Sequence, residues 1–311
     1  MKLPEAYSPE QIAEMIGARC INKGAGEITG INEIHRLEPG DITFVDHPKY
    51  YDKALGSVAT LIIIDKEVDC PDGKAILVTD TPFASYNSLT LKFSPFESAS
   101  KHLSDSATIG TGTIIQPGVF VGNHVDIGKN CLIHPQVSIY DNTQIGDNVI
   151  IHSNTTVGSD AFYFNKKEDK YSKMHSCGRV IIHDDVEIGS GCTIDKGVSS
   201  DTIIGEGCKL DNMVHVGHGV VIGKNCLFAA QVAIGGKVNI GDNVILWGQV
   251  GVSKDLTIGS NTEVWAQSGI GKDLAPNTVW WGSPAGEARE KMKELVLSRK
   301  LPEIWAKMRD Q

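Results

Sequence analysis

Residues 204–246 read IGEGCKLDNMVHVGHGVVIGKNCLFAAQVAIGGKVNIGDNVIL, and a large apolar residue occupies every sixth position of this stretch. The same spacing runs through residues 109–157 and, with one skip of four residues, through 182–270. Helices repeat every 3.6 residues and ordinary strands every two, so neither produces a strict period of six. A three-sided coil does, with one short strand and one corner per hexad. The sequence therefore predicts a parallel β-helix over residues 99–275, with each sixth side chain directed inward.

The residue after each inward position is often glycine, as at Gly128 and Gly223. We expect this glycine to turn the corner of the coil, because glycine adopts conformations that other residues avoid. The inward column should be the main source of stability, at roughly 1.5 to 3 kcal/mol for each buried side chain.

Composition narrows the class of protein. The 311-residue chain has 33 glycines and 6% aromatic residues, which fits many repeated turns, and its net charge of −9 argues against nucleic-acid binding. It contains no apolar stretch long enough to span a membrane, and its start lacks the pattern of a secretory signal. We expect a cytoplasmic protein without a transmembrane segment.

The parts outside the hexads predict two further regions. Residues 1–98 are typical of a small α/β domain, in which Ser8 begins a helix with a capping box and Thr81 caps a second helix through its side-chain oxygen. Residues 276–311 predict one or two amphipathic helices. The interruption at 158–178 is too long for a simple turn, and loops of that length usually have a function.

The seven cysteines show no C-x-x-C pair and predict reduced thiols rather than a disulfide framework. Cys192 and Cys226 each lie two residues before an inward position. We interpret them as small packing residues.

Candidate catalytic residues lie in one corner of the predicted coil. His218 follows the inward Val216 by two residues and should face outward as a general base or a structural histidine. Gly236 lies 18 residues later, so its N–H should stack about 4.8 Å away, where an oxyanion could be bound. Asp211 could orient the imidazole or form an Asp-Asn corner. His215 is predicted to be mostly a surface residue.

His134 and His152 are also spaced by 18 residues, so their imidazoles should stack. No third ligand with suitable spacing accompanies them, and we therefore expect no metal site. A corner or substrate-lining position is the interpretation that we prefer.

The run GRVIIHDDVEIGSGCTIDKGVSSDTIIGEGCKLDNMVHVGHGVVIG and the closing GSPA resemble the UDP-3-O-(3-hydroxyacyl)glucosamine N-acyltransferases of lipid A biosynthesis. The resemblance covers nearly the whole chain. It implies a left-handed β-helix, a homotrimer, and transfer of a 3-hydroxyacyl group from acyl carrier protein to a sugar amine. His218 would be the base, Asp211 its partner and Gly236 the oxyanion donor. No cofactor is implied, since the carrier brings its own phosphopantetheine.

The resemblance also implies substrate contacts outside the catalytic corner. The segment GDITFVDHPKY is similar to the family's nucleotide-binding segment, in which Phe44 and Tyr50 would sandwich the uracil ring beside His47. Without the resemblance to this family, we would interpret Phe44 and Tyr50 as core residues. Phe162, in the loop, and the two stacked histidines would line the substrate.

Two further contacts follow from the resemblance. Gly269 would leave an acyl groove open, since it has no side chain. Basic residues of the C-terminal region would dock the acidic carrier, although a solvated helix face explains them equally well. They are Arg289, Lys293, Arg299 and Lys300.

The chain departs from the family pattern at His47, where most members have Asn, and at Asp255, where many have His. These departures leave the exact sugar and the acyl chain length open. Two alternatives remain at this point. One is another sugar-nucleotide O-acyltransferase or acetyltransferase of the hexapeptide class, and the other is a β-helix with a structural role only.

Overall fold

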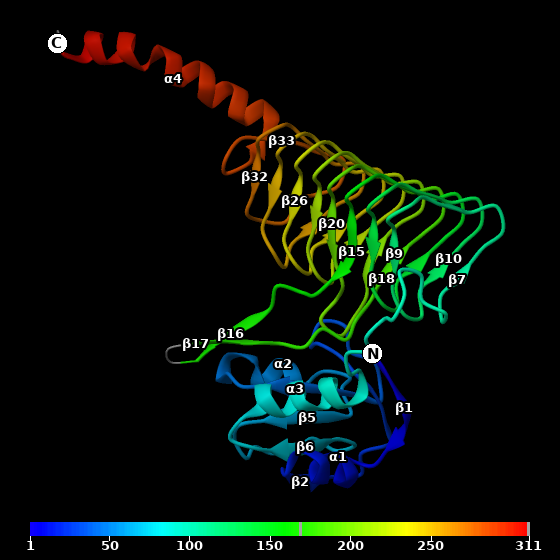
Figure 1. Ribbon diagram of the computed structural model, residues 1–311. Helices are drawn as coiled ribbons and strands as arrows, with labels where there is room; N and C mark the ends of the chain where they lie inside the picture. The colour runs from blue at the N-terminus through cyan, green and yellow to red at the C-terminus, as the bar shows by residue number, and fades with distance from the viewer. Residues whose placement is uncertain (168–169, 310–311) are drawn as a thin grey trace. The chain divides into compact units, whose positions relative to one another are not determined.

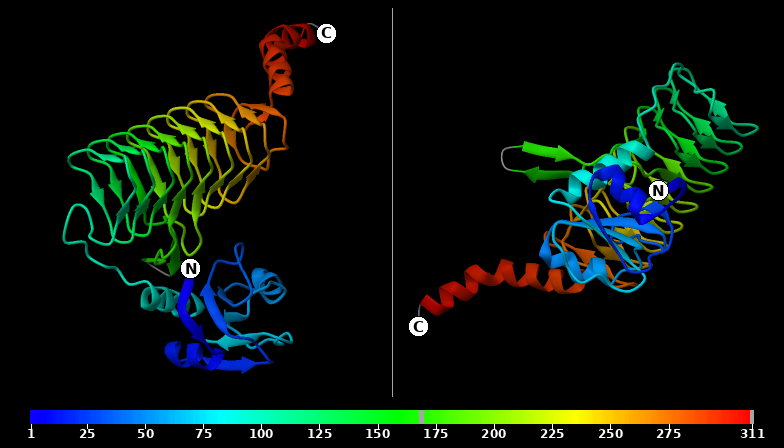
Figure 2. Two further views of the ribbon diagram at one scale, coloured as in Figure 1. Left: turned by 90° about the vertical axis from the view of Figure 1, so that its right-hand side faces the viewer. Right: turned by 90° about the horizontal axis from the view of Figure 1, so that it is seen from below.

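The computed structural model describes residues 1–167 and 170–309, which form two compact units. The N-terminal unit comprises Met1–Ala99, Asp160–Arg179 and Lys196–Asp201, and the prism unit comprises the remaining residues. Figures 1 and 2 show the elements of each unit. The predicted loop and the predicted C-terminal helices include residues 168–169 and 310–311, which lie outside the described residues.

The N-terminal unit is built on a six-stranded sheet with the order β1-β3-β4-β5-β6-β2. Its four inner strands run parallel, and β1 and β2 pair antiparallel at the two edges. The strands at 61–64 and 75–78 are continuous apolar runs in which only Val78 is not fully buried, as is typical of parallel sheets. The elements are β1 Lys2–Tyr7, α1 Pro9–Ile16, β2 Arg19–Asn22, β3 Ile28–Ile31, β4 Asp41–Val45, η1 Pro48–Tyr50, α2 Tyr51–Leu55, β5 Leu61–Ile64, β6 Ala75–Val78 and α3 Pro82–Phe93.

The two predicted helix caps had different outcomes. Ser8 accepts a hydrogen bond from the N–H of Gln11, and the Gln11 side chain accepts one from the N–H of Ser8, so the predicted capping box is confirmed. Thr81 does precede α3, but its side chain makes no capping bond. That detail of the prediction was wrong: Thr81 has φ of −134° and ψ of 62°, whereas Ser8, which does cap its helix, has φ of −79° and ψ of 157°.

The long interruption of the hexads is part of the N-terminal unit. It contains the antiparallel hairpin of β16 (Phe164–Lys167) and β17 (Lys170–Lys173). Ala161 and Met174, on either side of the hairpin, are buried in the hydrophobic core of this unit together with Val198. The chain therefore leaves the prism twice, at Asp160–Arg179 and at Lys196–Asp201, and both segments belong to the N-terminal unit.

The prism is the parallel β-helix that the hexads predict, and it is left-handed as the family resemblance implies. Its strands stack into three parallel sheets, one on each face, and partners in neighbouring coils lie 18 residues apart, as in Asp126 and Gln144.

The first sheet contains β7 Thr108–Ile109, β10 Asp126–Ile127, β13 Gln144–Ile145, β18 Val180–Ile182, β21 Thr202–Ile204, β24 Val221–Ile222, β27 Asn239–Ile240 and β30 Thr257–Ile258. The second contains β8 Ile114–Ile115, β11 Leu132–Ile133, β14 Ile150–Ile151, β19 Glu187–Ile188, β22 Lys209–Leu210, β25 Leu227–Phe228, β28 Ile245–Leu246, β31 Glu263–Val264, β33 Val279–Trp281 and β34 Gly286–Glu287. The third contains β9 Phe120–Val121, β12 Ser138–Ile139, β15 Thr156–Ser159, β20 Thr193–Asp195, β23 His215–Val216, β26 Ala233–Ile234, β29 Gly251–Val252 and β32 Gly269–Ile270.

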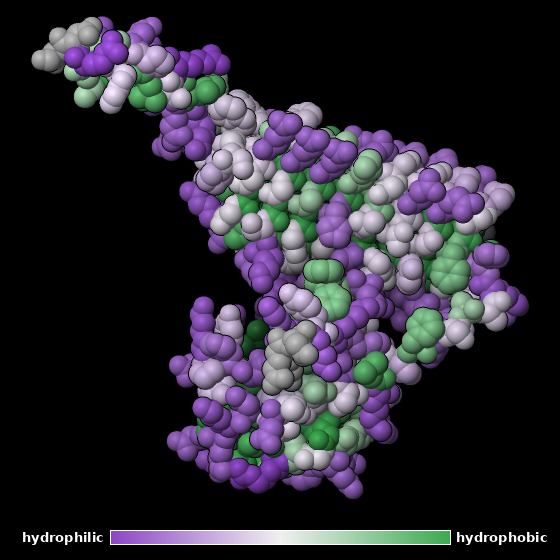
Figure 3. All heavy atoms as spheres, turned by 60° about the vertical axis from the view of Figure 1, so that its left-hand side comes forward, coloured by the Kyte–Doolittle hydropathy of each residue, from purple (hydrophilic) through white to green (hydrophobic). Residues whose placement is uncertain are grey.

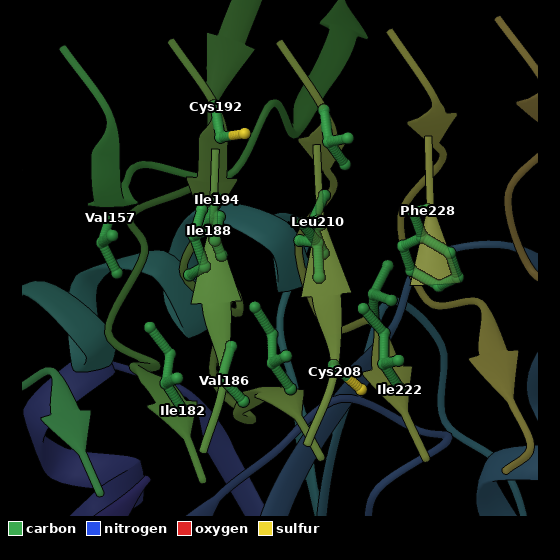
Figure 4. Packing of buried hydrophobic residues seen from close by; sticks show 14 of the residues in the cluster. Val157, Ile182, Val186, Ile188, Cys192, Ile194, Cys208, Leu210, Ile222 and Phe228 are labelled. Atoms are coloured by element: carbon green, nitrogen blue, oxygen red, sulfur yellow. The ribbon is translucent and has the colours of Figure 1, made fainter. Parts of the chain in front are cut away.

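The interior of the prism consists of stacked columns of apolar side chains (Figure 4). The predicted inward positions from 121 to 270 are buried, with Phe228 as the largest of them. A second buried column lies two residues earlier in each hexad and includes Cys192 and Cys226, 0% and 1% exposed. Both are free thiols, which confirms their interpretation as packing residues.

The corners are turned differently from the prediction. The left-handed conformation falls three residues after the inward position, where most residues are Asn or Gln, for example Asn130 and Asn225 with φ of +54°. Asparagine tolerates this conformation better than most residues do. The glycine directly after the inward residue has another role. A Cβ on Gly128 would lie 2.4 Å from the carbonyl oxygen of Gly146, so this glycine permits neighbouring coils to approach.

After the last complete coil the chain forms β33 and β34 and then one helix, α4 (Ala288–Arg309), which extends away from the end of the prism (Figures 1 and 2). Apolar side chains of α4 are exposed among polar ones (Figure 3). Within residues 1–167 and 170–309, no helix is both long enough and apolar enough to cross a membrane.

Candidate functional site

An open groove of about 630 Å³ lies on the outer face of the third sheet near the C-terminal end of the prism. The outward residues of four successive strands form its floor, from β23 to β32. These residues are His215, Ala233, Gly251 and Gly269, each one coil beyond the last. Because three of the four have little or no side chain, the floor is formed largely by backbone. Ser283 and Pro284 line the groove as well.

Gly251 and Gly269 keep the groove open in different ways. A Cβ on Gly251 would have no atom within 4 Å, so a side chain there would extend into the groove. A Cβ on Gly269 would lie 3.0 Å from the hydroxyl of Ser283, which leaves less room. Gly269 thus lies in a groove, and its contact with an acyl chain stays a prediction.

His218 lies in the corner after β23, and its imidazole packs against the next coil. A Cβ on Gly236 would come within 2.5 Å of Nε2 of this ring, so only glycine leaves room for it. The ring was predicted to face outward, but the residue is only 8% exposed because that coil covers it. Gly235, the residue before Gly236, lines the groove, whereas His218 and Gly236 are not among its lining residues.

The environment of His218 keeps its imidazole neutral. Burial is the largest cause that lowers its pKa to about 4, followed by the ammonium of Lys237, whereas the carboxylate of Asp255 acts in the opposite direction. A neutral imidazole at pH 7 has a ring nitrogen that can accept a proton. This is the protonation state that a general base requires.

Asp211 and His218 lie on different faces of the prism. Asp211 follows β22 of the second sheet, and its carboxylate accepts a hydrogen bond of 2.7 Å from the N–H of Asn212. That geometry corresponds to the Asp-Asn corner considered for this position. Its pairing with His218 stays a prediction.

His215 has more polar contacts than the sequence suggested. Its Nδ1 lies 2.8 Å from the hydroxyl of Thr193, and its Nε2 lies 4.0 Å from the carboxylate of Asp195. Asp195 is buried and accepts a hydrogen bond from Ser159. His215 thus marks the polar end of the groove. The run of His, Ala, Gly and Gly at 18-residue spacing was the signal that could have identified it.

The rings of His134 and His152 stack as predicted, with centroids 4.8 Å apart and an interplanar angle of 10°. Nε2 of His152 also lies 3.1 Å from the carboxylate of Glu187. These residues follow strands of the second sheet several coils before the groove, so one prism does not bring them to it. Among the described residues, no three His, Cys, Asp or Glu side chains are grouped so as to hold a metal ion.

The predicted uridine residues have unequal surroundings in the N-terminal unit. Phe44 packs against Tyr86 and Phe83, with centroid distances of 4.8 and 6.0 Å, and contributes to the core. Tyr50 is 47% exposed and lies 6.1 Å from the ring of His47. The structure therefore brings His47 and Tyr50 together at the surface and places Phe44 in the aromatic core beneath the sheet's helix α3.

Phe162 is 83% exposed and contacts Phe164 edge to face at 5.1 Å. An aromatic side chain with so little burial is available for a ligand. Its contact with the substrate stays a prediction.

The predicted carrier-docking residues are all exposed on α4. At 100° per residue, Arg289, Lys293 and Lys300 share one face of the helix, whereas Arg299 projects from another. Three of the four can therefore contact one partner together.

Two sequence profiles match the chain. Residues 26–90 match the family described as UDP-3-O-(3-hydroxymyristoyl) glucosamine N-acyltransferase, LpxD. Residues 124–159 and 201–236 match the six-repeat bacterial transferase hexapeptide. The first match lies in the N-terminal unit and the second in the prism.

Curated relatives extend the match along the chain. A UDP-3-O-acylglucosamine N-acyltransferase of Azorhizobium caulinodans is 38% identical over 340 aligned residues, which cover 98% of this chain and 95% of that protein. The enzyme of the same name from Dechloromonas aromatica is 38% identical over 229 residues, covering 67% of this chain and 66% of its own length.

Solved structures match about two thirds of the chain. A UDP-N-acetylglucosamine acyltransferase of Francisella novicida has a TM-score of 0.55 and 28% identity, over 62% of this chain and 70% of that one. A second UDP-N-acetylglucosamine acyltransferase has a TM-score of 0.53 and 28% identity, over 68% and 82% of the two chains.

Proposed function

Because this chain belongs to the UDP-3-O-acylglucosamine N-acyltransferase family, we propose that it transfers a 3-hydroxyacyl group from acyl carrier protein to the 2-amine of UDP-3-O-(3-hydroxyacyl)-glucosamine. This reaction belongs to lipid A biosynthesis. The observation that supports the proposed chemistry is the packing of the His218 ring against Gly236, the residue that follows the groove-lining Gly235.

The reaction begins with attack of the sugar amine on the thioester carbonyl carbon, which forms the C–N bond. His218 accepts the proton that the amine loses, a role that contributes about 10²- to 10⁴-fold to the rate. The carbonyl electrons move to oxygen, where the N–H of Gly236 stabilises the oxyanion. The oxyanion then collapses, the C–S bond breaks, and the leaving thiolate takes the proton from the imidazolium.

Binding of the two substrates is assigned to separate regions. The groove floored by Ala233, Gly251 and Gly269 would hold the acyl chain, because these three residues place no polar side chain on its floor. Phe44 and Tyr50 would sandwich the uracil ring beside His47, whose ring lies 6.1 Å from that of Tyr50.

The carrier protein would contact the basic face of α4, formed by Arg289, Lys293 and Lys300. It delivers the acyl group on its phosphopantetheine arm, so no dissociable cofactor enters the proposal. We further propose a cytoplasmic homotrimer, in which a neighbouring protomer could supply the Asp211 that lies on another face of the same prism.

One alternative function is favoured by a specific observation. The solved structures similar to the prism are UDP-N-acetylglucosamine acyltransferases. An enzyme acting on an acetylated sugar would acylate a hydroxyl, because that sugar has no free amine. Family membership argues against both this reading and a purely structural β-helix.

A direct assay separates these possibilities. Purified protein should convert UDP-3-O-acyl-glucosamine and 3-hydroxyacyl carrier protein into the N-acylated product, and UDP-N-acetylglucosamine should give none. His218→Ala should abolish the product. His183→Ala, a change at an exposed histidine on the first sheet, should not. Full activity in His218→Ala would disprove the assigned base.

A further inference from the structure

An ion pair lies beside the catalytic corner, on residues with no assigned role. Nζ of Lys237 is 2.9 Å from Oδ1 of Asp255, one coil further on, and the two side chains are 20% and 50% exposed. Lys237 directly follows Gly236 in the sequence. A pair that is partly withdrawn from water interacts more strongly than one on an open surface.

The backbones of these two residues bond to the two proposed catalytic residues. The N–H of Lys237 donates to the carbonyl of His218 at 2.8 Å, and the N–H of Asp255 donates to the carbonyl of Gly236 at 3.0 Å. The ion pair therefore joins two residues whose backbone N–H groups are hydrogen-bonded to the two proposed catalytic residues, Lys237 to His218 and Asp255 to Gly236. Movement of either residue would shift one member of the catalytic pair.

The residue types are unusual for their backbone conformation. Lys237 and Asp255 have φ of +63° and +61°, at corner positions where most other coils carry Asn or Gln. A lysine in this conformation is disfavoured relative to glycine or asparagine. The backbone conformation at position 237 does not favour lysine. We therefore attribute the lysine to a contribution of its side chain.

The charges around His218 come from three successive coils. His215 is on its own coil, Lys237 on the next, and Lys254 with Asp255 on the third. The two lysines and His215 disfavour the imidazolium, and Asp255 is the acidic group that favours it. Thr202, from the first sheet, is uncharged and accepts the N–H of Gly219.

We propose that the Lys237–Asp255 ion pair is a positioning device that keeps His218 and Gly236 in register and balances the charge beside the imidazole. The proposal rests on the proposed function, in which His218 takes up a proton. Without Asp255, the ammonium of Lys237 would oppose that uptake. Without Lys237, the carboxylate would stabilise the imidazolium before the amine had attacked.

The test uses Lys237→Met, Asp255→Asn and the double variant of the full-length protein. The titration of the His218 ring is followed by NMR, with His218→Gln used for assignment, and the acid limb of kcat/KM is measured in parallel. We expect titration at higher pH in Lys237→Met and at lower pH in Asp255→Asn, each by about half a unit. At neutral pH Asp255→Asn should lose roughly threefold in kcat/KM, the factor that corresponds to half a pKa unit.

The double variant should titrate near the wild type, because it removes both charges and their opposite effects on the imidazolium cancel. Lys237→Arg should restore the wild-type titration, because the charge returns. Lys224→Met is the matched control, because Lys224 forms an exposed ion pair with Glu206. These two residues are also 18 positions apart, like Lys237 and Asp255. Lys224→Met should leave both measurements unchanged.

Each unfavourable outcome has a distinct meaning. If His218 titrates identically in all variants, or if activity falls only in parallel with Tm, the pair is merely structural and the inference is wrong. If the titration shifts as expected but His218→Ala remains fully active, the ion pair does tune His218 and the proposed function of that histidine fails instead.

Discussion

The imidazole of His218 occupies the space that a side chain at Gly236 would need, with Nε2 2.5 Å from where a Cβ of residue 236 would be. The two residues are 18 positions apart in sequence and one coil apart in space. The imidazole that we propose as the general base and the backbone N–H that we propose as the oxyanion donor thus meet in one corner, without any long-range loop to position them.

The first prediction concerns this contact. Gly236→Ala should displace the imidazole, because a methyl group at 2.5 Å from Nε2 cannot be accommodated without movement. We expect kcat/KM to fall by about 10²- to 10³-fold, the loss associated with a displaced oxyanion donor or base. Gly248→Ala is the control, since its Cβ would lie at an ordinary 3.5 Å from the carbonyl of Ala230. Equal activity of the two variants would contradict the assigned geometry.

The second prediction concerns the groove. Gly251→Leu should extend a side chain into open space on the groove floor and shorten the channel. The variant should retain the fold and prefer shorter acyl chains than the wild type when a series of acyl carrier proteins is compared. An unchanged chain-length profile would show that the acyl chain lies elsewhere.

The third prediction concerns pH and stability. The folded-state pKa of His218, about 4, lies below the ordinary value of 6.5, so the unfolded chain binds the proton more readily. This stabilising contribution is present above pH 6.5 and is lost as the pH falls toward 4. The full loss is on the order of 3 kcal/mol. The free energy of unfolding, measured with denaturant at pH 7 and pH 4.5, should therefore decrease more for the wild type than for His218→Gln. Equal decreases in the two proteins would contradict the low pKa of His218.

The fourth prediction separates binding from folding in the N-terminal unit. Tyr50→Ala should raise KM for the UDP-sugar with little change in Tm, because Tyr50 is 47% exposed. Phe44→Ala should lower Tm, since it removes contacts with Phe83 and Tyr86 in the core. Removing a buried phenylalanine side chain typically costs about 3 to 5 kcal/mol, and Phe44 is only half buried, so a smaller value is expected. An unchanged KM in Tyr50→Ala would argue against stacking on the uracil.

The period of six in the sequence determined the prism, its inward column and its 18-residue register. It could do so because each hexad repeats the same local pattern, a buried strand residue followed by a corner. The stacked coils repeat this pattern along the whole prism. The spacing of His218 and Gly236 follows directly from that register. The sequence could not show that the glycine after each inward residue allows coils to approach rather than turning the corner.

Only the tertiary structure decided which outward residues act together. In the folded chain His215 lies at the end of a groove, and Lys237 forms an ion pair with Asp255. The His218 ring, which the hexad pattern predicted to face outward, is buried. The tertiary structure also placed Ala161 and Met174 in the core of the N-terminal unit. The physical reason is that exposure, charge and pKa depend on every neighbouring group within several ångströms, including groups from other coils, whereas periodicity records only which face of its own coil a residue occupies.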